Sequence, residues 1–308
     1  MNTANVIDVT KIEPAFKHSR IFERLNQLST GESLWIHNDH NPIPLLNQLA
    51  WERPGVFDWT YEVSGPRIWK IKIIKKEDFT QLSVGAIVAQ DYRKAEVFKK
   101  LGIDFCCGGA QSVESACREV GISSSELAKM LDEATQAASQ QWHQYNKWAP
   151  GFLADYIINT HHQYTREAGD VLLSIAEKVA THHGRKHPEL SDLLQRLQSM
   201  LQELNDHMDA EEQGLFPKMH YLEDAQLEKQ ELQSLVQEMH QDHDHTGMDI
   251  QYLRTITDNY TLPEDACNSY HFLFEKLQEF ENDLLQHIHL ENNILFPKAL
   301  ELAKENAV

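Results

Sequence analysis

The chain has 308 residues, which predicts roughly two or three domains. Hydrophobic residues make up 41% of it, and the net charge of −19 disfavours nucleic acid or an anionic membrane as a partner. Residues 1–16 show no basic-then-apolar leader, and no apolar run approaches the roughly 20 residues of a membrane span. The four cysteines are too few and too clustered for a disulfide scaffold. We therefore expect a cytoplasmic protein with no membrane or nucleic-acid partner.

Residues 1–78 predict a small α/β sandwich. Alternating polarity indicates two strands that are joined by Ser64-Gly65-Pro66, a sequence typical of a hairpin turn. The expected elements are a helix over 16–28, a strand over 33–37, a short helix that opens at Pro42 or Pro44, and strands over 57–63 and 67–75.

Residues 80–136 predict a short all-helical domain. A helix is expected over 84–101, where Gly102 ends it, and Ser112 and Ser123 can cap two further helices. The glycine-flanked pair Cys106-Cys107 lies between the first two helices. The polar and aromatic stretch 139–151 is expected to be a linker.

Residues 150–308 predict a four-helix bundle. Four long segments with bundle periodicity are separated by breaks at 182–188, 216–226 and 257–263. The multidomain chain is thus of the α+β class, with the sheet in its N-terminal domain.

Ionisable residues occupy positions in this bundle that the periodicity reserves for apolar side chains. Glu211 and Glu291 lie on the inward seams of the second and fourth segments, and a histidine precedes each by one turn. An unpaired buried carboxylate costs several kcal/mol, so each glutamate requires compensation. In one helix a buried His–Glu ion pair would suffice, but matched residues on four helices favour metal ligands. The candidates are His162, His207, Glu211, His243, His287 and Glu291.

The motif H-x3-E-x4-F-P occurs twice, from His207 to Pro217 and from His287 to Pro297. A single histidine precedes each copy, by 45 residues in the first half and by 44 in the second. The two halves therefore predict helical hairpins related by a pseudo-twofold axis. Four imidazoles and two carboxylates without a thiolate predict two metal ions, with iron favoured over manganese and zinc.

Together with the GIDFCCGG stretch at 102–109, this ligand pattern resembles the iron-sulfur cluster repair di-iron proteins, the RIC or YtfE/ScdA-like family. The resemblance covers roughly residues 80–308. It implies an N-terminal ScdA-like helical domain at 80–136 and a hemerythrin-like bundle at 150–308. The same six residues would hold two iron ions in an oxo- and carboxylate-bridged di-iron centre.

The resemblance also implies a stress-response function. The protein would restore iron-sulfur clusters damaged by oxidants or nitric oxide, by donating iron to damaged iron-sulfur proteins or cluster scaffolds. Nitric oxide or oxygen would be small ligands, and the chain would be a monomer or homodimer. The alternative is a hemerythrin-like module that senses or binds oxygen or nitric oxide. Whether any step is catalytic is left open.

Through LWIHNDHNPIPLL at 34–46 and GPRIWKI at 65–71, residues 1–78 resemble the DUF2249 domain, which is related in shape to the SirA/TusA sulfur carriers. No cysteine precedes Cys106, so we do not expect sulfur transfer by this domain. A small metal site at His37, Asp39 and His40 is conceivable, although a polar turn is the simpler interpretation.

Adjacent cysteines seldom form a good disulfide, so Cys106 and Cys107 are expected to be two thiols. We place them near a helix N-terminus, which would lower their pKa. They are candidates for an iron relay or a redox function, and the alternative is a structural turn.

Overall fold

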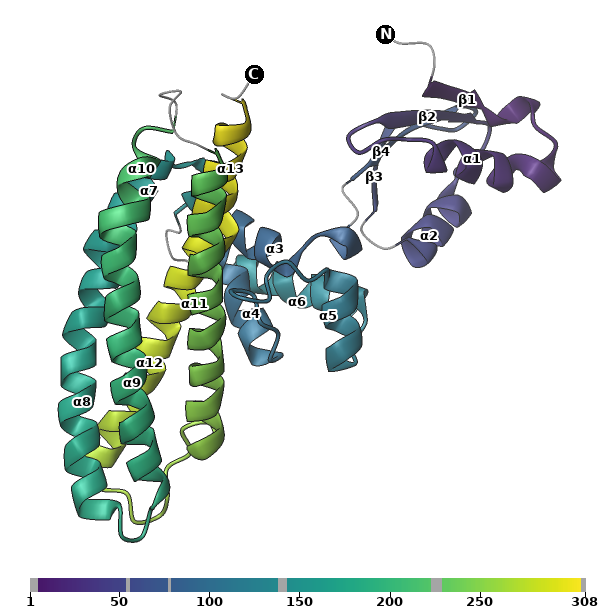
Figure 1. Ribbon diagram of the computed structural model, residues 1–308. Helices are drawn as coiled ribbons and strands as arrows, with labels where there is room; N and C mark the ends of the chain where they lie inside the picture. Colours follow the sequence, from purple (N-terminus) through teal and green to yellow (C-terminus); the bar gives the residue numbers. More distant parts are fainter. Residues whose placement is uncertain (1–4, 54–55, 77–78, 138–142, 223–228, 306–308) are drawn as a thin grey trace. The chain divides into compact units, whose positions relative to one another are not determined.

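The computed structural model describes residues 5–53, 56–76, 79–137, 143–222 and 229–305 (Figure 1). The chain forms two compact units, Met1–Ser83 with Ser112–Glu133, and Val84–Gln111 with Ala134–Val308. The predicted order of a small sheet region, short helices and a long helical bundle is confirmed. The domain boundaries proposed above remain predictions. Within the described ranges, no helix has the length and apolar character needed to cross a membrane.

The first unit contains a four-stranded sheet of order β1-β2-β4-β3, in which β1 runs parallel to β2 and the other pairs are antiparallel. Its alternating strands place Leu34 and Ile36 opposite Ile73 and Ile71, all buried against the two helices. The elements are β1 (Val6–Asp8), α1 (Lys17–Asn26), β2 (Ser33–Asn38), α2 (Ile43–Glu52), β3 (Phe57–Ser64) and β4 (Trp69–Lys75). Strand β1 was not predicted, because three residues are too few to show a periodicity.

Of the residues considered for a metal site in this unit, His37 lies in strand β2, and Asp39 and His40 form a polar turn after it. His40 Nδ1 lies 2.6 Å from Asp39 Oδ1, and both side chains are exposed. Asn38 Nδ2 donates to the carbonyl oxygen of His40. Among the described residues, no group able to hold a metal ion includes His37, Asp39 or His40.

The helix predicted over 84–101 is interrupted at Asp91. The Asp91 side chain accepts a hydrogen bond from the backbone N–H of Arg93 and pairs with its guanidinium, and this local bond competes with a continuous helix. The resulting helices are α3 (Val84–Gln90) and α4 (Ala95–Lys100), joined by a 3₁₀ turn at Tyr92–Lys94. Ser112 and Ser123 cap α5 (Val113–Val120) and α6 (Ser124–Ala137) as predicted.

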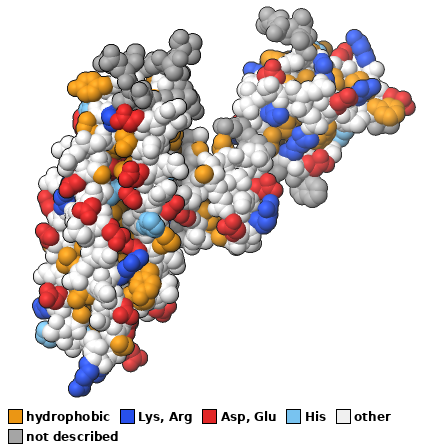
Figure 2. Space-filling model, viewed as in Figure 1, with side chains coloured by type: hydrophobic (Ala, Val, Ile, Leu, Met, Phe, Trp, Pro, Cys, Tyr) orange, Lys and Arg blue, Asp and Glu red, His pale blue; other side chains and the backbone are white. Residues whose placement is uncertain are grey.

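The four predicted bundle segments are confirmed, and three of them contain a π-helical turn. Contacts between α8 and α9, α9 and α11, α11 and α13, and α12 and α8 close the bundle (Figure 1). Asp and Glu side chains are spread over its visible face (Figure 2). The segments are α7 (Pro150–Ile157), Ile158–His162 and α8 (Gln163–His183); α9 (Glu189–Ala210), Glu211–Leu215 and α10 (Phe216–Met219); α11 (Lys229–Ile256); and α12 (Asn268–Leu290), Glu291–Leu295 and α13 (Phe296–Glu305).

The linker prediction is wrong at its C-terminal end. Pro150 and Gly151 are the first residues of α7 and both are buried. Proline is well suited to this position, because the first helical N–H has no intrahelical partner. Tyr145, within the expected linker, is also buried. Residues 139–142 of this stretch lie outside the described residues.

Leu197 on α9 tests the packing of the bundle, because its side chain is fully buried. We expect Leu197→Ala to lower the free energy of unfolding by about 2–5 kcal/mol, through lost burial and the cavity left behind. Chemical denaturation of the metal-free protein measures this change. The neighbouring exposed residue provides the control, and Gln198→Ala should change stability by less than about 0.5 kcal/mol.

Candidate metal centre

The bundle brings all six sequence-predicted ligands together in its interior. They form two groups that could each hold a metal ion, and every member is buried. One group contains His162 and His287, the other contains His207 and His243, and both include Glu211 and Glu291. Each group therefore takes one histidine from each helical hairpin, as the pseudo-twofold arrangement requires.

Both glutamates lie between the two groups. Glu291 Oε1 is 2.9 Å from His287 Nε2, while its Oε2 is 3.1 Å from His243 Nε2. Glu211 Oε2 is 3.3 Å from His162 Nε2 and 3.5 Å from His207 Nε2. Either carboxylate can thus reach both metal positions, which is the geometry of a bridging ligand.

Hydrogen bonds on the far side of the histidines fix which ring nitrogen faces the centre. His162 Nδ1 lies 2.8 Å from Glu212 Oε1, and His207 Nδ1 lies 3.1 Å from Asp242 Oδ2. A carboxylate accepts hydrogen bonds, so each Nδ1 carries the proton. In the neutral imidazole, the Nε2 lone pair then points inward, as in a metal-ligating histidine.

These inward lone pairs are crowded. His162 Nε2 and His287 Nε2 are 3.1 Å apart, and His207 Nε2 and His243 Nε2 are 3.0 Å apart. Within the described residues, both oxygens of Glu211 and Oε2 of Glu291 are buried without a hydrogen-bond partner. Buried acceptors that face one another are stabilised by cations between them, so the donor set fits two metal ions.

Protonated histidines are the metal-free alternative. Burial lowers the pKa of His162 and His243, but Glu211 and Glu291 outweigh it and raise the pKa to about 10 and about 9, respectively. Burial lowers the pKa of His287 to about 3. Burial and then the charge of Glu291 raise the pKa of Glu211. Protons can therefore neutralise part of the centre, but they leave His287 uncharged.

Each π-helical turn contains one ligand, namely His162, Glu211 or Glu291. In the two motif copies, the N–H of Phe216 bonds to the Glu211 carbonyl and the N–H of Phe296 bonds to the Glu291 carbonyl. The proline that follows each phenylalanine cannot donate a backbone hydrogen bond, so a wider turn is tolerated there. Single π turns are frequent at functional sites. The sequence analysis did not predict them.

The phenylalanine of each motif packs on the single histidine of its own half. Phe216 stacks on His162, with ring centroids 5.5 Å apart, and Phe296 stacks on His243 at 6.1 Å. These contacts explain why the phenylalanine recurs at the same distance from the glutamate. They hold the histidine rings in place and exclude water from one side.

The residue after each glutamate orients the same histidines, and the sequence analysis missed this role. Glu212 bonds to His162 Nδ1, and Asn292 Oδ1 lies 2.8 Å from His243 Nδ1. Arg166 holds Glu212 in turn, with Nη1 2.7 Å from Oε1. The signal was present in the sequence, because both motif copies have a polar residue at this position.

Asp242 precedes His243 in the sequence, but its side chain contacts His207. Glu203, one turn before His207 on α9, is exposed and accepts a hydrogen bond from Ser199 Oγ. Two histidines that lie off the predicted seams, His161 and His289, are buried. A seam pattern identifies residues that face the bundle axis and misses those buried between neighbouring helices.

The Cys106-Cys107 pair lies in a turn on the outside of α11. Asp104 fixes this turn by accepting hydrogen bonds from the backbone N–H groups of both cysteines. The two sulfurs are 3.8 Å apart, and Cys107 Sγ is 3.3 Å from the carbonyl oxygen of His243. Gly247 permits this approach, because an added Cβ would lie 3.3 Å from Cys107 Sγ.

The expected lowering of the thiol pKa is wrong for Cys106. Its hydrogen bond with Cys107, burial and the charge of Asp104 raise the pKa of Cys106 well above its ordinary value. The pair also does not lie at a helix N-terminus, since α5 begins only at Val113. With Asp104, the two thiols form a third group that could hold a metal ion.

A substitution of Asp242 tests whether the hydrogen bond to His207 Nδ1 strengthens metal binding. Asp242→Ala removes the acceptor of His207 Nδ1, and we expect the affinity for Fe²⁺ to fall about tenfold. Competition with a chelator measures the affinity. Asp244→Ala, which changes an exposed acid two residues further along α11, is the control and should leave the affinity unchanged.

Comparisons with known proteins agree with this arrangement. The sequence matches family models described as "Uncharacterized conserved protein (DUF2249)" at residues 6–75, "Domain of Unknown function (DUF542)" at 80–135 and "Hemerythrin HHE cation binding domain" at 153–299. The iron-sulfur cluster repair protein YtfE of Yersinia pestis (strain Pestoides F) is 34% identical over 225 residues, which are 72% of this chain and 98% of that protein. A probable iron-sulfur cluster repair protein of Haemophilus influenzae is 31% identical over 226 residues, with the same two coverages. The chain therefore belongs to the family of iron-sulfur cluster repair proteins.

Proposed function

We propose that this protein repairs iron-sulfur clusters damaged by oxidants or nitric oxide, and that it does so by donating iron from a di-iron centre in its bundle. The convergence of four imidazoles and two spanning carboxylates in a buried site supports this proposal most directly. The relatives named as iron-sulfur cluster repair proteins supply the link to cluster repair.

The donor set supports iron as the metal. His162 and His287 would hold one ion, His207 and His243 the other, and Glu211 and Glu291 would bridge them. Mixed nitrogen and oxygen ligation inside a helical bundle suits iron. Six protein ligands for two ions leave coordination positions for an oxo bridge or a small diatomic ligand. Bound iron would supply transferable metal and a reactive site for oxygen or nitric oxide.

Cys106 and Cys107 are proposed to relay iron or to act as a redox pair. Both are free thiols, and Cys107 contacts the helix turn that carries the ligand His243. Cys107 is the more accessible of the two, since Cys106 is buried. Asp104 would complete a small thiolate and carboxylate site at the outside of the bundle.

Reactivation of a damaged enzyme tests the function. The iron-loaded full-length protein is added anaerobically to an aconitase-type enzyme whose cluster has been damaged by nitric oxide. We expect enzyme activity to return, and the same protein without iron should not restore it. Binding of nitric oxide or oxygen without any reactivation would favour the sensing alternative.

Glu211 tests the di-iron assignment. Glu211→Leu restores the apolar seam and removes one bridging carboxylate, so we expect less iron per chain while the helical circular dichroism is retained. Glu203→Leu is the matched control on the exposed face of the same helix and should keep two iron ions. Unchanged iron content in Glu211→Leu would contradict the bridging role.

The cysteine pair can be tested separately from the di-iron centre. We expect a Cys106→Ser/Cys107→Ser variant to keep its iron content but to repair damaged clusters more slowly, because the relay is lost. Iron analysis and the reactivation assay measure the two properties. Repair at the wild-type rate would remove the cysteines from the mechanism.

A further inference from the structure

The two metal positions differ in one respect that the sequence repeat does not reveal. Asp242, which precedes the single histidine His243, is the hydrogen-bond partner of His207 Nδ1. In the first half, His161 precedes His162 and so occupies the place equivalent to that of Asp242. It supplies no acceptor, because its ring stacks on that of His287 at 5.8 Å and 11°. In the described structure, His287 Nδ1 is consequently buried without a hydrogen-bond partner.

This difference makes the His162/His287 position the less firmly held of the two. A ligating histidine is normally oriented by a hydrogen bond to its second ring nitrogen, and loss of that partner weakens metal binding about 10–100-fold. His207 and His243 both have such a partner, whereas His287 has none in the described residues. The more weakly held position would exchange its iron more readily than the other.

His161 also connects this position to a pocket. His161 Nδ1 lies 3.0 Å from Asp283 Oδ1, and Asp283 lines a cavity of about 610 Å³ between α12 and the segment 84–111. Asp283 Oδ2 and His161 Nε2 have no hydrogen-bond partner within the described residues. Asp283 thus contacts the histidine that stacks on His287, and its second oxygen is buried without a hydrogen-bond partner in the described structure.

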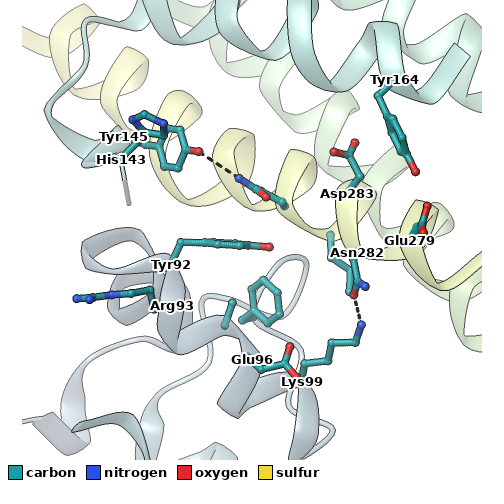
Figure 3. A pocket seen from close by; sticks show the side chains of 14 residues that line it. Tyr92, Arg93, Glu96, Lys99, His143, Tyr145, Tyr164, Glu279, Asn282 and Asp283 are labelled. Atoms are coloured by element: carbon teal, nitrogen blue, oxygen red, sulfur yellow. Dashed lines mark hydrogen bonds between the residues drawn. The ribbon is translucent and has the colours of Figure 1, made fainter. Parts of the chain in front are cut away.

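The pocket is lined by aromatic rings, by carboxylates and by two cations, Arg93 and Lys99, which pair with Asp91 and Glu281. Figure 3 shows Tyr92 reaching into the space from the segment 84–111 and Tyr164 reaching into it from α8, with Asp283 on α12 between them. Aromatic faces attract cations, and Phe105 and Tyr145 extend this lining. The pocket acids Glu96 and Glu279 are paired with lysines, whereas among the described residues Asp283 has only His161 as an ion-pair partner.

We propose that ferrous iron enters and leaves the His162/His287 position through this pocket, with Asp283 and His161 as transfer ligands. Asp283 and His161 would each provide one donor atom in exchange for a water ligand of the ion, and no electron is transferred. The His207/His243 position would retain its iron. This inference rests on the proposed role as an iron donor and assigns that role to one of the two positions.

Iron exchange by the full-length protein tests the proposal. A ferrous chelator in excess removes iron anaerobically, and stopped-flow absorbance follows the release. We expect the wild-type protein to lose one iron ion faster than the other. In Asp283→Asn, the rates of release and of uptake should both fall by about tenfold. Iron content at equilibrium should stay the same, because a residue on a path changes both rates equally.

Two further variants make the result specific. Asp265→Asn removes a carboxylate that also pairs with a histidine, His187, but lies outside the pocket lining, and it should exchange iron like the wild type. Asn282→Trp fills part of the pocket without altering Asp283 or His161, and it should slow exchange in both directions.

The outcomes are distinguishable. If Asp283→Asn lowers iron content without equal changes in the two rates, Asp283 only positions His161, and the proposed path is wrong. Wild-type exchange rates in both pocket variants would also overturn it. A wild-type protein that takes up no iron would overturn the proposed function, and this inference with it.

Discussion

The interior of the bundle contains two carboxylates and four imidazoles at positions where a helical bundle normally has leucine. Their acceptor atoms face one another at distances near 3 Å, and several have no hydrogen-bond partner among the described residues. Such an arrangement is costly in a nonpolar core unless positive charge lies between the groups. The surrounding contacts are arranged around this constraint, because each of them orients or shields one of the six side chains.

Each copy of the repeated motif provides candidate ligands, a residue that orients a histidine and a ring that packs on that histidine, all in one short stretch of helix. Its histidine and glutamate are candidate ligands. The residue after the glutamate orients the single histidine of the same half, and the phenylalanine packs on that histidine ring. The proline follows a π turn that begins at the glutamate. The spacing of the motif therefore reflects the geometry of two helices, and a change at one position would disturb several contacts.

The two halves nevertheless differ in the hydrogen bonding of one candidate ligand, His287. Asp242, which precedes His243, is the hydrogen-bond partner of His207. At the equivalent place before His162 stands His161, and His287 has no partner for its Nδ1 in the described structure. Two ions held with equal strength would serve storage or oxygen binding. Unequal positions, one of them next to a pocket, are better suited to donating iron while the bundle stays folded. The cysteine turn lies against α11 at His243, on the side of the His207/His243 position, and would have a separate role.

The sequence alone determined the class of the fold and identified six candidate ligands, which the structure brings together. Periodicity is a local property, so four helices, their inward seams and the residues that interrupt those seams could be identified without knowing how the helices pack. The two-residue period likewise predicted β2, β3 and β4 in the sheet. Family resemblance extended this to the cysteine turn and to the expected chemistry.

Only the tertiary structure decided how these residues pair. The division of the ligands into two groups, the π turns, the contact of Asp242 with His207, and the burial of His161 all depend on the rotation of one helix against another. The raised pKa of Cys106 also follows from burial against the bundle and from its hydrogen bond with Cys107, which sequence spacing does not contain. Sequence spacing identifies the residues that face inward, whereas packing determines which of them meet, because contacts between helices join residues that are far apart along the chain.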